Sequence, residues 1–266
     1  MKMYLCATDV IKKGGIASTR SVLEAEDIPS RMVKLRSSAL HRQLRRAGTR
    51  ALPTLGLIAI LLGTSFCYAE NKNEAKKSYD SVLNKAARDL KDGKIDDASN
   101  DAQQAEKLDP DNPETANLLG IVASKKKDYQ EAISQFNRAL TENPKFYTAK
   151  FNLADTLMLQ GSYDQARSVL EDLGQVDPKS EILQFRMALD YVLANQTAKA
   201  MALIDEMDFP GKTPAYYYAR AAVWLKKGLV KDATQYSLNA HKYYTESQCS
   251  YFVSVLREMG LDASVL

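Results

Sequence analysis

The chain has 266 residues, of which 45% are apolar and 26% are charged, with 12 Gly and 8 Pro. These are the proportions of a globular protein, so they exclude collagen-like, intrinsically disordered and multi-span membrane proteins. The two His and three Cys are too few and too scattered for zinc fingers, iron–sulfur clusters or a histidine-based catalytic triad.

The net charge of +3 conceals two regions of opposite sign. Residues 1–50 carry 11 Lys or Arg against 4 Asp or Glu, whereas residues 70–266 carry 25 basic and 29 acidic side chains. Because this long region has no basic excess, we expect no nucleic-acid binding. Residues 1–50 form a basic leader without a repeat pattern, which we expect to be disordered. A translation start further along, such as Met32, explains it better than a cytoplasmic tail.

Residues 51–69, ALPTLGLIAILLGTSFCYA, carry no charge and follow an arginine-rich stretch. A basic flank, a short apolar run and small residues at the end are typical of an export signal. The strongly apolar part, residues 55–62, is shorter than the roughly 20 residues that span a membrane. We predict cleavage after Ala69; a retained single-span anchor or a buried helix are the alternatives. The protein is then periplasmic or anchored outside the cytoplasm, with membrane contact only through residues 51–69 if they are uncleaved.

Several columns of residues recur about every 34 positions, which indicates an internal repeat. The clearest column consists of Ala98, Ala132, Ala166, Ala200 and Ala233. A second column of small residues contains Ala86, Gly120, Ala154, Ala188 and Ala221. A turn column contains Gly93, Gly161 and Gly228 and is interrupted by Lys127 and Asn195. Since the columns agree in phase, they define successive units of one kind.

The best two units, residues 113–146 and 147–180, resemble the tetratricopeptide repeat (TPR) family. In the first, the residues that match the family pattern are Leu119, Gly120, Ala123, Tyr129, Ala132, Phe136, Ala139 and Pro144. The resemblance implies one helix-turn-helix per repeat, stacked into a right-handed superhelix. It divides the chain into repeats 79–112, 113–146, 147–180, 181–213 and 214–245, followed by a helix over 246–261.

Apolar periodicity leads to the same architecture. Within 113–126 and 129–142 the apolar residues recur at three- and four-residue steps, which predicts amphipathic helices. Asn112 before Pro113 is a typical helix start, and Thr213 before Pro214 is another. We therefore predict an all-α, TPR-type α-solenoid of about five repeats. Residues 246–261 are expected to cap its last repeat; a docking helix for a partner is the alternative.

No residue pattern indicates catalysis. There is no glycine-rich phosphate loop in a strand–helix context, and His241 has no second ligand at metal-binding spacing. The acidic pairs Asp96–Asp97 and Asp109–Asp111 suit helix termini better than general acid–base chemistry. We therefore expect no enzyme activity, no metal and no cofactor.

The resemblance also implies where a ligand lies, because TPR proteins usually bind along the inner face formed by the first helix of each repeat. Carried over to this sequence, the candidate partner-binding groove consists of Phe151, Asp155, Met158, Leu159, Ile182, Phe185, Leu189, Val192, Tyr218 and Leu225. An exposed apolar and aromatic surface suggests binding. Two alternatives stay open: the superhelix closes on itself, or the last helix folds into this face.

A subset of TPR proteins binds a C-terminal carboxylate with a clamp of Lys, Asn, Asn, Lys and Arg. Asn152 and Arg186 match that clamp, but Asn117, Ile121 and Ile182 replace the other three residues. The positive charge that such a clamp needs is largely missing, so the resemblance does not extend to this subset.

These observations predict an exported, non-enzymatic scaffold or adaptor that holds a peptide or a partner protein on its concave face. The alternative is an accessory or sensory subunit domain of a membrane-associated enzyme or of a secretion or assembly complex.

Overall fold

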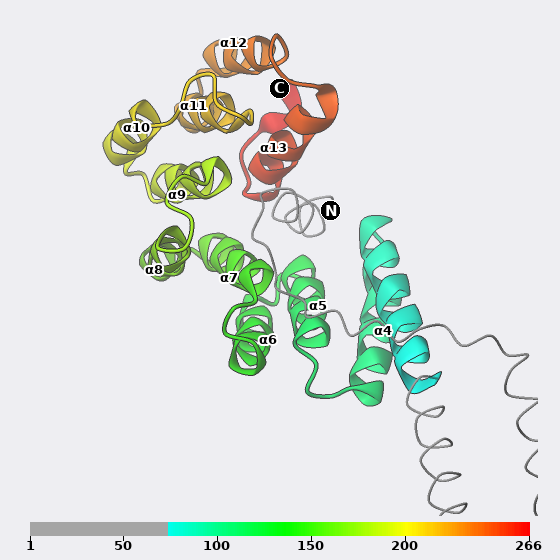
Figure 1. Cartoon of the computed structure of the whole chain (residues 1–266). Coiled ribbons are helices and arrows are strands. Elements are labelled where there is room, and N and C mark those ends of the chain that lie inside the picture. Colours follow the sequence, from blue (N-terminus) through cyan, green and yellow to red (C-terminus); the bar gives the residue numbers. More distant parts are fainter. Residues whose placement is uncertain (1–73) are drawn as a thin grey trace, which may run out of the picture. The chain divides into compact units, whose positions relative to one another are not determined.

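The computed structural model describes residues 74–266 and is helical, with no strand in that part of the chain. The predicted leader, residues 1–50, and the predicted export signal, residues 51–69, lie outside the described residues. Residues 79–266 belong to one compact unit, drawn from cyan to red in Figure 1. The all-α fold class predicted from the repeat columns is therefore confirmed.

The helices follow one another as five pairs and a final helix. The first pair consists of the helical residues 74–91 and α4 (Ile95–Leu108). The other elements are α5 (Pro113–Lys125), α6 (Tyr129–Glu142), α7 (Tyr147–Gln160), α8 (Tyr163–Gly174), α9 (Glu181–Leu193), α10 (Thr197–Asp205), α11 (Ala215–Lys226), α12 (Val230–Ala240), α13 (Glu246–Glu258) and the 3₁₀-helix η1 (Ala263–Val265). Apart from the first turn of the first pair, each pair lies within one of the predicted repeats.

The helix starts follow the capping residues of the sequence. The Asn112 side chain accepts a hydrogen bond from the backbone N–H of Glu114 at 2.9 Å, with Pro113 in the first helical turn. This satisfies one of the amide groups that a helix start leaves without a partner. At the second predicted start, Thr213 lies two residues before the helix, because α11 begins only at Ala215.

The turn inside each pair has one backbone conformation throughout. Gly93, Gly161 and Gly228 have φ between 73° and 86°, and the two residues that interrupt this column, Lys127 and Asn195, have φ of 65° and 59°. The repeat therefore imposes a left-handed residue after each first helix, whatever side chain the sequence supplies. Glycine is common at this position because it adopts this conformation without strain.

The small residues of the repeat columns are buried. All five alanines of the first column, from Ala98 to Ala233, are fully buried. In the second column, a Cβ atom on Gly120 would come within 2.6–2.9 Å of the Phe136 ring. Helices α5 and α6 can pack at this distance only because no side chain stands at that position.

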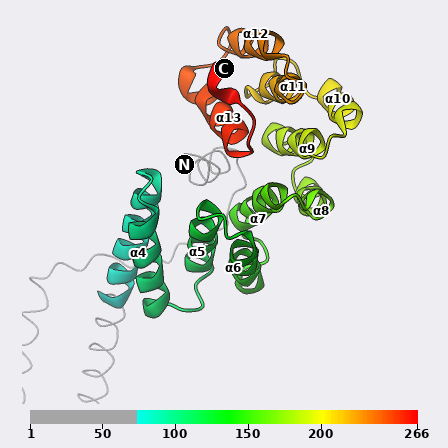
Figure 2. The same cartoon turned by 180° about the vertical axis from the view of Figure 1, so that it is seen from behind.

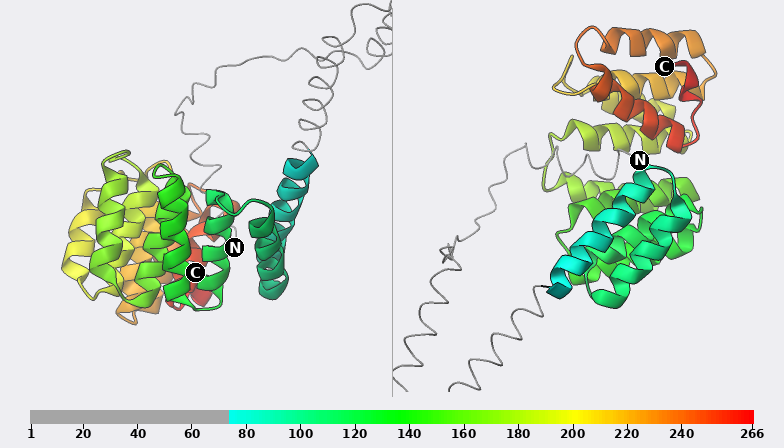
Figure 3. Two further views of the ribbon diagram at one scale, coloured as in Figure 1. Left: turned by 90° about the horizontal axis from the view of Figure 1, so that it is seen from below. Right: turned by 90° about the vertical axis from the view of Figure 1, so that its right-hand side faces the viewer.

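Successive pairs pack against one another across neighbouring repeats: α6 contacts α7, α8 contacts α9, and α9 contacts α11. Figures 2 and 3 show these pairs side by side in chain order. The final helix α13 does not continue this arrangement. It contacts α11 and lies on the inner side of the pairs that precede it, facing α9 and α7 (Figure 1).

The residues after α13 lie against the last pair. The Thr234 hydroxyl of α12 donates a hydrogen bond to the Val265 carbonyl at 3.3 Å, and Ala263 is buried in the main hydrophobic cluster. The C-terminal segment therefore covers two surfaces: α13 covers the inner face, and the short tail after it covers part of α12.

Candidate functional site

All ten candidate groove residues lie on three first helices. Helix α7 carries Phe151, Asp155, Met158 and Leu159; α9 carries Ile182, Phe185, Leu189 and Val192; α11 carries Tyr218 and Leu225. Six of them are buried, namely Asp155, Met158, Phe185, Leu189, Val192 and Tyr218. The other four are partly exposed. The structure thus brings the set onto neighbouring helices but does not leave it as an open apolar groove.

Helix α13 covers the aromatic part of this surface. The Phe252 ring makes an edge-on contact with Phe185, with centroids 4.9 Å apart and an interplanar angle of 79°. The same ring stacks on Tyr218 at 5.6 Å and 14°. Offset and edge-on pairs are the favourable arrangements of aromatic rings. Of the alternatives left open by the sequence, the structure has the last helix folded into the inner face.

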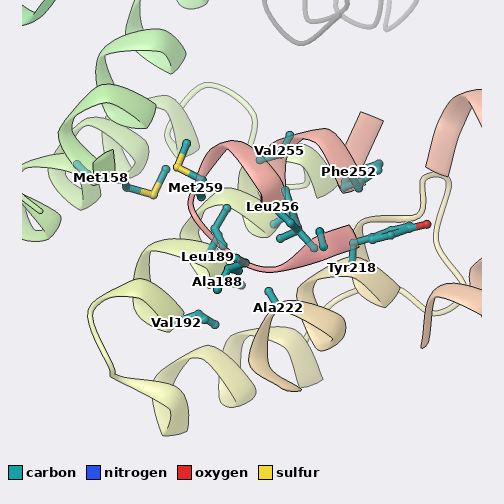
Figure 4. Close-up of a cluster of buried hydrophobic side chains, with 14 of the residues drawn as sticks. Met158, Ala188, Leu189, Val192, Tyr218, Ala222, Phe252, Val255, Leu256 and Met259 are labelled. Atoms are coloured by element: carbon teal, nitrogen blue, oxygen red, sulfur yellow. The ribbon is translucent and has the colours of Figure 1, made fainter. Parts of the chain in front are cut away.

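Aliphatic residues of α13 complete the contact (Figure 4). Val255 and Leu256 are fully buried, and Leu256 points toward Leu189 of α9. Met259, just beyond the helix, lies beside Met158 of α7. These side chains belong to one hydrophobic cluster, so an amphipathic helix occupies the surface that the sequence assigns to a ligand.

One ion pair lies inside this apolar surface. The Arg186 guanidinium donates to both Asp155 carboxylate oxygens, at 2.9 and 3.2 Å, and the two side chains are 3% and 1% exposed. A third nitrogen donates to the Tyr251 hydroxyl of α13 at 3.1 Å. The Phe151 ring lies 5.0 Å from the guanidinium carbon. The pair therefore joins α7, α9 and α13.

Electrostatics hold this arginine in its charged form. Burial alone would lower the pKa of Arg186, but the Asp155 carboxylate and Tyr251 outweigh it, so the pKa lies above its usual value. Burial also raises the pKa of Asp155, although the guanidinium opposes that shift. A buried pair of this kind must stay hydrogen-bonded, because removing either partner leaves the other without compensation.

The two residues that match the carboxylate clamp are both engaged within the chain. Asn152 donates to the Asn117 side-chain oxygen at 2.8 Å, and Arg186 is bound to Asp155. Neither is positioned here as part of a clamp for a peptide carboxylate.

The sequence interpretation missed two polar contacts that involve α13. Tyr251, which accepts from Arg186, and Lys125, which forms an ion pair with Glu258 of α13, are both absent from the candidate residues. The pairing of Asp155 with Arg186 had a detectable signal, since opposite charges occupy the inner faces of adjacent repeats. The partners on α13 had none, because the predicted repeats end at residue 245 and α13 lies beyond them.

In the part of the chain that the structure describes, no three His, Cys, Asp or Glu side chains gather as a metal site would require. Burial raises the pKa of the Cys249 thiol, which disfavours the reactive thiolate. What the inner face provides is apolar, aromatic and hydrogen-bonding contact.

Comparison with known proteins identifies the same repeat that the sequence columns indicate. Residues 83–145 and residues 123–189 each match a sequence profile described as Tetratricopeptide repeat. Anaphase-promoting complex subunit 3 of Schizosaccharomyces pombe is 26% identical over 159 residues, which is 54% of this chain and 24% of that protein. The chain thus matches about a quarter of the length of this relative.

Solved structures share the fold at low sequence identity. A thermophilic TPR protein of Thermus thermophilus has a TM-score of 0.54 and 22% identity, covering 71% of this chain and all of that one. A TPR protein of Parabacteroides merdae has a TM-score of 0.53 and 20% identity, covering 97% and 98%. TPR proteins are generally scaffolds for protein interaction and typically not catalysts. With its repeat columns, its paired helices and these matches, the chain belongs to the tetratricopeptide repeat family.

Proposed function

We propose that this protein is a non-enzymatic scaffold that holds a helical segment of a partner protein on its inner face. The observation that carries the proposal is that α13 already binds there. Its Phe252 ring packs between Phe185 and Tyr218, and Arg186 reaches its Tyr251 hydroxyl. Aromatic and arginine anchors of this kind dominate binding energy at protein interfaces. A helix laid in an apolar groove is a common mode of peptide recognition.

We also propose that the protein is exported. The support is the basic, apolar and small-residue pattern that ends at Ala69. Within residues 74–266, none of the helices has both the length and the apolar content needed to span a membrane. We propose membrane contact through residues 51–69 alone, and only if they are retained.

Affinity capture with a tag placed after Leu266 tests the binding surface. Phe185 and Leu189 are fully buried, so charged substitutions there would unfold the protein. Leu159 and Leu225 are partly exposed on inner-face helices and are the better choice. We expect Leu159→Asp and Leu225→Asp each to weaken binding of the captured partners at least tenfold, roughly 1.4 kcal/mol.

The matched control is Leu238→Asp, because Leu238 is 57% exposed on the second helix α12. It makes the same chemical change away from the inner face and should leave capture unchanged. Equal capture by the wild type and all three variants would contradict the proposal.

The intact mass of the same preparation tests export, with a chain that begins at Glu70 as the expected result.

A further inference from the structure

Helix α13 is a self-contained segment. At its start, the Thr245 backbone N–H donates to the Gln248 side chain at 2.9 Å, and the Thr245 hydroxyl accepts from the Gln248 N–H at 3.4 Å. Such a capping box satisfies the first amides within the helix itself. At its end, Gly260 takes the left-handed conformation with φ of 78°. The helix therefore does not need the repeats to complete its termini.

The repeats and α13 are complementary in charge as well as in shape. On the repeats, Arg186 and Lys125 are cationic and belong to α9 and α5. On α13, Tyr251 accepts from Arg186 and Glu258 pairs with Lys125. Between these polar contacts, Phe252 fills the aromatic site formed by Phe185 and Tyr218. One face of a single short helix satisfies all of these positions.

The binding surface has an internal ion pair whose partners both belong to the repeats. The two hydrogen bonds from Arg186 to Asp155 involve no atom of α13, so no buried charge is left without a partner when this helix leaves. In contrast, Phe185, Leu189 and Tyr218 would form an apolar patch in water, which soluble proteins rarely leave uncovered. The surface therefore needs an occupant, and it is suited to exchange one helix for another.

We infer that α13 is an exchangeable occupant of the inner face and that it competes with an amphipathic helix of the same chemistry from another polypeptide. This inference rests on the proposed function and specifies its ligand. The incoming helix carries an aromatic residue at the position of Phe252, apolar residues at those of Val255, Leu256 and Met259, and a carboxylate at that of Glu258. By covering the site, α13 keeps the scaffold in a state of low affinity.

A synthetic peptide of residues 245–261 is the probe, with its binding to the full chain followed by fluorescence anisotropy. The variant Phe252→Ala/Leu256→Ala weakens the resident helix and leaves the site itself unchanged. We expect it to bind the peptide at least tenfold more tightly than the wild type does. The control Arg257→Ala changes an exposed residue of the same helix and should behave as the wild type. A peptide that carries the Phe252→Ala change should bind the weakened variant at least tenfold less tightly.

The outcomes separate the inference from the proposed function. Equal peptide binding to the wild type and the weakened variant would show that α13 does not compete, and it would leave the scaffold function intact. No binding to a weakened variant that keeps its helical circular dichroism would overturn the inference. If Leu159→Asp and Leu225→Asp left capture unchanged while the peptide still exchanged with α13, the proposed function would be contradicted instead.

Hydrogen exchange on the wild type gives a second measurement that does not depend on a variant folding. If α13 is exchangeable, it opens without global unfolding. Its amides should then exchange at least tenfold faster than those of α9 and α11. Identical exchange rates in the three helices would mean that α13 leaves only when the protein unfolds, and that result would also overturn the inference.

Discussion

The residue after the first helix of each pair has a positive φ in all five repeats, and in two of them it is not glycine. Lys127 has φ of 65° and Asn195 has φ of 59°. A left-handed conformation brings the Cβ of an L-residue close to the following carbonyl oxygen and costs about 1–2 kcal/mol, less for asparagine, whose short polar side chain tolerates it. The repeat geometry overrides this cost, since the neighbouring helices fix the direction of the chain.

Lys127→Gly should therefore stabilise the protein. We expect the free energy of unfolding in urea to rise by about 0.5–1 kcal/mol. Glycine removes the backbone strain, and its greater entropy in the unfolded chain offsets part of that gain.

The matched control is Lys126→Gly, one residue earlier, where φ is −77°. Glycine gains nothing there, and we expect a loss of about 0.5–1 kcal/mol. If Lys127→Gly lowered stability as much as this control does, the left-handed residue would not be a source of strain.

At the scale of the helix pair, packing depends on small residues at the crossings. A Cβ on Gly120 would lie 2.6–2.9 Å from three atoms of the Phe136 ring, and that ring is fully buried. Relieving this overlap requires the buried ring to shift or α5 and α6 to separate. We expect Gly120→Ala to lower the free energy of unfolding by about 1–3 kcal/mol, the usual cost of overpacking.

Gly174 in α8 is the control, since a Cβ there would meet only a Leu183 methyl group at 3.5 Å, an ordinary contact. Gly174→Ala should be neutral or stabilising by about 0.4–1 kcal/mol, because alanine restricts the unfolded chain. Equal effects of the two changes on thermal unfolding would refute the steric account of the Gly120 column.

At the scale of the whole molecule, tyrosines with raised pKa values lie near both ends of the array: Tyr79 is buried and Tyr244 is partly exposed. The Tyr79 hydroxyl in the first pair is hydrogen-bonded to the Thr115 hydroxyl at 2.7 Å, and burial raises the pKa of Tyr79 to about 12. Burial raises the pKa of Tyr244, after the last pair, to about 12 as well. In a repeat protein, stability is approximately a sum over neighbouring units, so alkaline pH weakens the array from both ends.

The direction of the pH effect follows from proton linkage. The unfolded chain has a tyrosine pKa of about 10, so it releases these protons before the folded protein does. The stability contributed by the protonated phenols is fully present below pH of about 10 and is lost as the pH rises to about 12. We expect Tyr79→Phe to reduce the slope of the unfolding free energy against pH by the equivalent of about one proton. Urea unfolding at pH of about 9 to 11.5 measures the slope.

Thr115→Val is the control for the alkaline experiment. It removes the hydrogen-bond partner but keeps the phenol, so it should lower stability at neutral pH and preserve the alkaline slope. Parallel curves for the wild type and Tyr79→Phe would show that this phenol does not contribute to alkaline unfolding.

The repeating part of the fold could be predicted from the chain alone. Ala98 and its four equivalents mark the helix crossings, and Asn112 marks a helix start, because these features depend on neighbours at a fixed distance along the sequence. The same regularity placed Asp155 on the inner face, whereas Arg186 was recognised only as a match to the carboxylate clamp. Their pairing was not predicted, because the two residues are 31 positions apart and are not equivalent positions of a period of about 34.

The position of α13 was decided only by the tertiary structure. Its apolar residues, among them Phe252 and Leu256, fit the inner face or the edge of the last repeat equally well, because an amphipathic pattern defines which side of a helix is buried and not what covers it. The choice depends on contacts with Phe185, Arg186 and Tyr218, which are 34 to 67 positions away in the sequence. Spacing along the sequence does not settle this choice, because the surface that receives the helix exists only once the stacked pairs have formed it.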